Sequence, residues 1–456
     1  MPARRPGSTL DAGGGSDHGD SITEQVRPCQ SSTGGPGAGS GLSTLFGRHT
    51  ENDPFTRAAG TRQVIDLEED PMVEGKIWAN SGDSHFVEPP DLFDTRLPED
   101  LAARMPRSVK DADGMWETVT VDGLSFRRRM PRPSTLPATS GESVDDKHRR
   151  APLAGDAGTG RDIQARLKDL DEEGVWAELT FPSLGIWSFC IRDPKLAREG
   201  ARVLNDWALQ MQHSSPRFVC TAAIPLLDLG DAVAEVQRTK GLGFAAVSLP
   251  VKPSLDGPAW VHPYFDPLWD AIDEAGMVIA FHIGTEPHTP DQRTGVVHHG
   301  RGGAVMNYTE TTFGGQRVAC QMVASGVLDR RPNLKVIVSE GGSGWVPFMA
   351  DRLDEAYRQH SAAVEPKLTR PPGEILYSQV YASFQHDYRS SVLAMTGAGY
   401  RNAVWGSDYP HFEGTYGHTQ KTLHELFDDV PEDVRHRITV GAFAELFPHV
   451  PPPPAG

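Results

Sequence analysis

Short apolar runs alternate with longer amphipathic stretches from Lys76 to the end of the chain. The apolar runs are nearly continuous, which is typical of strands that helices cover on both faces. The amphipathic stretches between them predict helices. The predicted strands, in chain order, are residues 77–86, 175–181, 218–227, 244–251, 277–284, 334–342, 379–386 and 402–410.

This pattern makes eight strand–helix units, which predict an α/β fold of the (β/α)8 TIM barrel type. A doubly wound open sheet is the competing prediction, because it also alternates strands and helices. Such a sheet normally carries a glycine-rich phosphate loop after its first strand, and the "SGDSHF" at 81–86 is not one. We therefore expect the barrel.

The rest of the chain departs from this alternation. Residues 1–75 are rich in Gly, Ser, Thr and Pro and are predicted to be disordered, because they cannot bury enough apolar surface. Residues 76–448 form the predicted barrel. A segment at about 99–160 is expected to be an insertion after the first strand, with a hairpin turn at Asp122-Gly123. Residues 449–456 form a proline-rich tail.

Composition narrows the classes of function. The 456-residue chain has a net charge of −17, which argues against nucleic-acid binding, and we expect the "RRR" at 127–129 to be a local solvated face. No run of eighteen apolar residues occurs, so no membrane span is expected. The four cysteines are far apart and form no CxxC motif. A cytoplasmic setting is therefore expected, without disulfides or a structural zinc cluster.

Residues that can bind metals follow several of the predicted strands. Asp83 and His85 end the first strand, His282 ends the fifth and Asp408 ends the eighth. The carboxyl ends of barrel strands converge on one mouth, where these side chains would meet. Asp83 and His85, two residues apart on a strand, share one face. Two imidazoles and two carboxylates suit one divalent ion, with zinc first and manganese or iron as alternatives.

Taken singly, each of these residues has an ordinary structural role, so the prediction depends on their shared placement. Glu340 ends the sixth strand, which is apolar at both alternating positions, so the pattern does not give its direction. It is either a general base, a further ligand or a carboxylate bonded to loop amides. His411 follows Asp408 and would bond to that carboxylate or to a substrate. Loop or surface roles are expected for Lys252, His298, His299 and Glu413.

Five motifs occur together, in this order: "DSHFVEPPDLF" at 83–93, "FHIG" at 281–284, "SEGGSGWVPFMADRLDEAY" at 339–357, "WGSDYPHFEGT" at 405–415 and "GAFAELFP" at 441–448. In these motifs the sequence resembles the amidohydrolase superfamily. It is most similar to the amidohydrolase-related branch that includes aminocarboxymuconate semialdehyde decarboxylase and related aromatic-acid decarboxylases.

The resemblance implies a metal-dependent barrel with one divalent ion, usually zinc. The family's ligands are a His-x-His on strand one, a histidine on strand five and an aspartate on strand eight, which match His85, His282 and Asp408. Asp83 replaces the first histidine, so the site is harder and more anionic. Glu340 replaces the family's strand-six histidine, which assists proton handling in the decarboxylases.

The leading prediction is a metal-dependent hydrolase that activates water to cleave a small organic carboxylate, amide or ester. Asp408 would bind the metal and accept the proton of the water, with Glu340 or His411 as the auxiliary acid or base. An anionic substrate would need a cation such as Arg293 or Arg301. One alternative is a non-oxidative decarboxylase of an aromatic or unsaturated acid, and another is a non-catalytic binding barrel. A homodimer is expected by analogy with the family.

Overall fold

The computed structural model describes residues 75–129, 161–254, 257–286, 298, 300–411 and 413–454. The segment predicted to be disordered lies outside these residues apart from Gly75, as does the later half of the predicted insertion. None of the described helices is long and apolar enough to cross a membrane.

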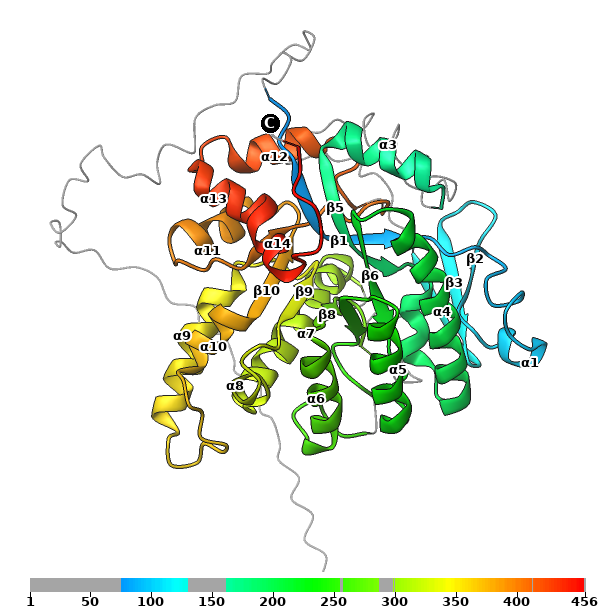
Figure 1. The fold of residues 1–456 in the computed structure, drawn as a ribbon, viewed down its shortest axis with the longest axis horizontal. Coiled ribbons are helices and arrows are strands. Elements are labelled where there is room, and N and C mark those ends of the chain that lie inside the picture. Colours follow the sequence, from blue (N-terminus) through cyan, green and yellow to red (C-terminus); the bar gives the residue numbers. More distant parts are fainter. Residues whose placement is uncertain are drawn as a thin grey trace, which may run out of the picture. The chain divides into compact units, whose positions relative to one another are not determined.

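Eight parallel strands form one sheet that follows chain order, with helices outside it (Figure 1). The strands are β1 (Ala79–Phe86), β5 (Val175–Pro182), β6 (Phe218–Ala223), β7 (Ala246–Leu249), β8 (Val278–His282), β9 (Val336–Ser339), β10 (Val380–Phe384) and β11 (Ala403–Trp405).

The sheet curls until its first and last strands meet. Ser84 and Tyr409 form a parallel bridge between the end of β1 and the residues after β11. The amide of Asp408 donates to the carbonyl of Asp83 at 2.8 Å, and the amide of His85 donates to the carbonyl of Tyr409 at 2.6 Å. The result is a nearly closed barrel, and the predicted α/β (β/α)8 TIM barrel is confirmed.

The helices follow the strands in alternation. They are α1 (Glu99–Ala102), α3 (Ile163–Glu173), α4 (Pro194–Ser214), α5 (Leu229–Gly241), α6 (Asp266–Ala275), α7 (Gly303–Ala324), α8 (Val327–Arg330), α9 (Trp345–Gln359), α10 (Pro372–Gln379), α11 (Leu393–Thr396), α12 (Thr419–Phe427), α13 (Glu432–His436) and α14 (Ala442–Leu446). Short 3-10 or π turns are η2 (Gly185–Cys190), η3 (Pro263–Phe265), η4 (Tyr388–Val392) and η5 (Arg437–Gly441).

Helix α7 differs most from its prediction. The sequence pattern predicts a helix near Thr311–Ser325, but α7 begins at Gly303, eight residues earlier. Its first ten residues include one glycine, one asparagine and three threonines, which have low helix propensity and resemble a loop in the sequence.

A three-stranded antiparallel sheet lies between β1 and α3 in the chain. It consists of β2 (Arg107–Lys110), β3 (Trp116–Val121) and β4 (Leu124–Arg129). The predicted hairpin turn joins β3 to β4, with φ of 47° at Asp122 and 78° at Gly123. Positive φ at both positions is typical of the tight turn that Asp-Gly favours.

Alternate strand residues fill the barrel interior, and the C-terminal helix closes one end of it. Phe443 and Phe447 join the cluster of inward side chains that includes Leu179 and Val404. Helix α14 thus seals the amino ends of the strands and leaves the carboxyl ends as the mouth. A second cluster lies between the outer strand faces and the helices.

Candidate metal centre

Four side chains from β1, β8 and the residues after β11 converge at the barrel mouth. Asp83, His85, His282 and Asp408 are each at most 5% exposed. The Nε2 atoms of His85 and His282 lie 3.1 Å apart. Oδ1 of Asp83 lies 3.4 Å from Nε2 of His282, and Oδ1 of Asp408 lies 3.5 Å from Nε2 of His85. The four residues predicted from sequence as ligands therefore come together in space.

Two acidic residues at strand ends have a left-handed backbone. The φ angle is 61° at Glu340, directly after β9, and 54° at Asp408, after β11. This conformation strains a residue with a side chain by about 1–3 kcal/mol and often marks functional sites. The turn directs the Glu340 carboxylate to the cluster, with Oε2 3.7 Å from Nε2 of His282. The strand pattern could not give this direction.

The approach of β1 to β11 depends on a small residue and on hydroxyl groups. A Cβ atom on Gly406 would lie 3.1 Å from Cβ of Asp83 and 2.8 Å from Oγ of Ser383. Ser81, Ser84 and Ser407 place their hydroxyl oxygens 3.0–3.1 Å from one another at the same junction. These contacts fix the distance between the two strands that carry Asp83 and Asp408.

Hydrogen bonding orients His282 for metal binding. Its Nδ1 lies 2.9 Å from the carbonyl of Ile283, which leaves Nε2 facing the cluster. Burial alone would lower the pKa of His282, but the charges of Asp83 and Glu340 raise it to about 10. Burial lowers the pKa of His85 well below its usual value. The cluster therefore holds a proton on His282 that a divalent ion would displace.

The carboxylate oxygens provide the test of a metal site. Both oxygens of Asp83 and both of Asp408 are buried without a well-directed hydrogen bond from any described residue. A buried carboxylate without partners costs several kcal/mol, so such groups are normally paired or bind metals. Ligands of a tetrahedral zinc ion are ~3.3–3.6 Å apart, given metal–ligand distances of ~2.0–2.2 Å. The spacings listed above, together with 3.9 Å between Nε2 of His85 and Oδ1 of Asp83, lie close to these values, so the cluster can accommodate a divalent ion.

Two further titratable groups flank these ligands. Nδ1 of His411 lies 2.8 Å from Oδ1 of Asp408, and its ring stacks on His85 with centroids 3.9 Å apart. Burial works against protonation of His411, but the Asp408 carboxylate outweighs it and raises the pKa. Burial, followed by repulsion from Asp408, raises the pKa of Glu340 well above its usual value. Both groups can hold a proton beside the ligand cluster.

Among the remaining candidates from the sequence, Glu413 lies near the cluster, because burial and then repulsion from Asp408 raise its pKa. The other described candidates have no contact with the cluster. Lys252 is exposed, and His298 pairs with Glu310 at 2.7 Å, in line with their predicted surface and loop roles. Arg301 is exposed and forms no ion pair with any described residue. Glu413 is exposed in the loop after Asp408. Arg293 and His299 lie outside the described residues.

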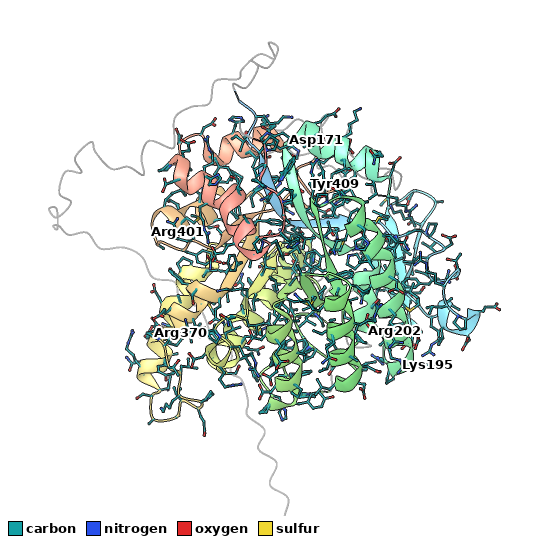
Figure 2. All side chains as sticks on the ribbon, in the orientation of Figure 1. Asp171, Lys195, Arg202, Arg370, Arg401 and Tyr409 are labelled. Atoms are coloured by element: carbon teal, nitrogen blue, oxygen red, sulfur yellow. The ribbon has the colours of Figure 1, made fainter. Side chains whose placement is uncertain are left out.

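Sequence reasoning missed a buried ion pair behind the site. Arg166 of α3 donates to Oε2 of Glu178 and to the carbonyl of His85, both at 2.8 Å. Its guanidinium also lies 4.7 Å from the ring centre of Tyr409, the residue after Asp408. Tyr409 lies beside α3, inside the ring of helices, as Figure 2 shows. The sequence did carry a signal for this pair: Arg166 lies on the apolar stripe of a predicted helix, and Glu178 lies within an apolar predicted strand.

The chain is similar to curated proteins that are named as decarboxylases. It is 23% identical over 278 residues to the decarboxylase yanB of Aspergillus niger, which covers 59% of this chain and 73% of that one. It is 31% identical over 202 residues to the gamma-resorcylate decarboxylase of Rhizobium radiobacter, which covers 42% of this chain and 59% of the relative.

A solved structure shares the fold. The dihydroxybenzoic acid decarboxylase of a Polaromonas species, determined with bound manganese and the inhibitor 2-nitroresorcinol, superposes with a TM-score of 0.53 at 18% identity. The match covers 81% of this chain and 97% of that one. The family model described as amidohydrolase matches residues 175–448, which is more than half of the chain. The chain therefore belongs to the amidohydrolase family.

Proposed function

We propose that this protein is a metal-dependent carboxy-lyase that releases CO2 from an aromatic or unsaturated carboxylic acid. The observation that carries the proposal is a pair of largely buried candidate ligand groups that share His85, one with Asp83 and His282 and the other with Asp408 and His411. Apart from the contact of Asp408 with His411, no charged side chain other than these histidines pairs with the two aspartates among the described residues. The names of the relatives support decarboxylation over the hydrolysis that the sequence favoured. Both reactions need the same ligands, so the reaction itself has to be measured.

Asp83, His85, His282 and Asp408 would hold the ion. When bound, a divalent ion there supplies the positive charge that attracts a substrate carboxylate and a neighbouring oxygen. The cluster needs this charge, because Asp83, Asp408 and Glu340 are acidic and no described Lys or Arg forms an ion pair with them. An oxygen-rich ligand set suits manganese as well as zinc.

Glu340 is the proposed proton donor. The bond between the ring carbon and the carboxylate carbon breaks, and its electron pair stays on the ring carbon. That carbon takes the proton of Glu340, and CO2 leaves. Burial and then repulsion from Asp408 raise the pKa of Glu340, which favours the protonated carboxyl. Its side chain is 16% exposed, so solvent can restore the proton. His411 holds and orients Asp408 on the opposite side.

The test uses full-length protein loaded with manganese or zinc and a panel of hydroxybenzoates and unsaturated acids in D2O. We expect CO2 release with one deuterium at the carbon that carried the carboxylate. Exchange of 13C-bicarbonate into the acid checks the reverse reaction. Two results together would establish the hydrolase instead. No acid would release CO2 at full metal occupancy, and the products of amides or esters would take up 18O from solvent water.

The homodimer and the cytoplasmic setting stay predictions.

A further inference from the structure

The barrel mouth contains a hollow on the side of β6 and β7, which we call the β6–β7 pocket. It has a cavity volume of about 70 Å³ and opens to solvent. Its floor is formed by Ala223, Ser248 and Pro250. Its described walls are mainly apolar and include Ile186, Phe189 and Leu226. One water molecule needs about 10–15 Å³, so a cavity of this volume has room for a small group.

Strand register places this pocket beside the metal ligands. Ala223 pairs with Ser248, and Ser248 pairs with Ala280 in β8. Ala280 and His282 alternate onto the same inner face of β8. Leu249 pairs with Phe281, so Pro250 and His282 follow side by side. The floor of the pocket thus continues the inner layer of the barrel that holds His282.

Small side chains create the hollow. The inward positions at the mouth are large on neighbouring strands, where His85, Phe181 and His282 pack together, with the Phe181 ring centre 4.9 Å from that of His282. On β6 and β7 the last inward residues, Ala223 and Ser248, are small. Thr180 pairs with Cys220, so the β6 residue level with Phe181 is Thr221. One polar group also faces this region, because Oγ of Ser188 is buried without a hydrogen-bond partner among the described residues.

The outer wall of the pocket is held in place by two supports. The buried Glu88 carboxylate, three residues after His85, accepts hydrogen bonds from the amides of Leu184 and Gly185 at 3.0 and 2.6 Å. A Cβ atom on Gly185 would lie 2.8 Å from Oε1 of Glu88, so the close approach requires glycine.

The insertion sheet provides the second support. Phe126 of β4 stacks on Trp187 with ring centres 5.4 Å apart, and Trp187 stacks on Phe189 at 6.1 Å. Phe189 in turn lines the pocket. The wall is therefore packed between the barrel and the insertion sheet, as a preformed binding site requires.

We propose that the β6–β7 pocket binds the apolar body of the substrate, so the preferred acid carries an alkyl chain or a second ring. This inference rests on the proposed decarboxylase function, in which the carboxylate lies at the metal ligands. The pocket lies next to the cluster, because Thr285 lines it and donates to the carbonyl of His282 at 2.7 Å. The occupant is therefore the part of the substrate that lies beyond the ligand cluster. A bare hydroxybenzoate would leave this apolar surface exposed to water.

Calorimetric titration of the metal-loaded full chain with 3-alkylphenols, from methyl to pentyl, tests the pocket. We expect the affinity to rise about fourfold for each added methylene, since burial of one contributes ~0.8 kcal/mol and 1.4 kcal/mol is tenfold. Ala223→Leu and Ser248→Leu should flatten this dependence on chain length. The matched variants Ala324→Leu and Ser361→Leu, at exposed positions, should keep it. Metal content and the unfolding midpoint check that each variant folds.

The outcomes separate this inference from the proposed function. Affinity that is independent of chain length in the wild type would overturn the pocket, whether or not acids release CO2. If the affinity still rises with chain length in both Ala223→Leu and Ser248→Leu, the alkyl chain binds elsewhere, and this result would also overturn the pocket. A gradient that the filling variants abolish supports the pocket even if no acid releases CO2, and in that case only the proposed reaction fails.

Discussion

At the scale of single residues, the site depends on two acidic side chains in strained backbone. Asp408 and Glu340 both have positive φ at the ends of their strands. Asparagine and aspartate tolerate this conformation better than most residues, whereas glutamate has no such preference. The strain at Glu340 thus directs its carboxyl to His282 instead of along the strand. We interpret this as positioning for proton transfer.

Glu340→Gln tests that role, because glutamine keeps the shape and the backbone strain but cannot release a proton. We expect kcat for CO2 release to fall by about 10²–10⁴-fold, the usual contribution of acid–base catalysis. Metal content, measured by atomic emission, should stay equal to that of wild type. Glu355→Gln, at an exposed position of α9, is the matched control. Loss of metal together with activity would show that Glu340 is a ligand and not the proton donor.

At the scale of elements, α3 holds together the junction at which the barrel closes. Arg166 bonds to the carbonyl of His85 and faces Tyr409. One helix therefore contacts the candidate ligand His85 on β1 and the residue that follows Asp408 beyond β11. Arg166 and Glu178 are both fully buried. A buried charge that loses its partner destabilises the fold strongly, whereas removal of both charges together is often neutral.

The substitution Arg166→Met should lower the free energy of unfolding by about 3–5 kcal/mol, because Glu178 is left buried and unpaired. The double variant Arg166→Met/Glu178→Met should recover most of that stability. Its metal affinity should stay below that of wild type, because His85 and Tyr409 lose their common support. Urea unfolding and metal titration measure the two quantities.

The control for this prediction is Arg202→Met on α4. Arg202 lies at the outer edge of the molecule and is 48% exposed, 3.9 Å from Glu235 (Figure 2). Its loss should change stability by less than about 1 kcal/mol. Wild-type metal affinity in the Arg166→Met/Glu178→Met variant would contradict a positioning role for Arg166.

At the scale of the whole molecule, the acidic mouth links stability to pH and to metal. Without metal, His282 has a pKa of about 10 and the pKa of Glu340 is raised. A group whose pKa is higher in the folded state stabilises the protein while it keeps its proton. His282 supplies this stability fully below its unfolded pKa of about 6.5 and loses it as pH rises toward about 10. Glu340 acts in the same direction.

The unfolding free energy of chelator-treated protein should therefore fall as pH rises from about 7 to about 9. His85, whose pKa is lowered, does not oppose this, because it is neutral in both states in that range. His282→Ala should flatten the slope, and excess manganese should remove it, since a bound ion stabilises the folded state and replaces the proton. Urea titrations at three pH values measure how the unfolding free energy changes with pH. An unfolding free energy that rises with pH in metal-free wild type would contradict this account.

The sequence predicted those features that depend on local period and chain order. Near-continuous apolar runs indicated the barrel, and the position of Asp83, His85, His282 and Asp408 at strand ends brought them to one mouth. The direction of Glu340 could not be predicted, because it depends on one positive φ angle.

Features that depend on pairing between side chains of different elements were also missed. The Arg166–Glu178 pair joins α3 to β5, and neither residue alone shows its partner. The pocket floor at Ala223 and Ser248 follows from strand register, which periodicity does not give.

The most direct test of the central claim is the metal content of purified protein after exchange into manganese or zinc. We predict one divalent ion per wild-type chain, with loss of the ion in Asp408→Asn and His282→Ala. The matched variants Asp428→Asn and His436→Ala, at exposed positions, should keep it. Full occupancy in both site variants would contradict the ligand assignment. A wild-type chain that takes up well below one ion would contradict the metal centre and favour a non-catalytic barrel.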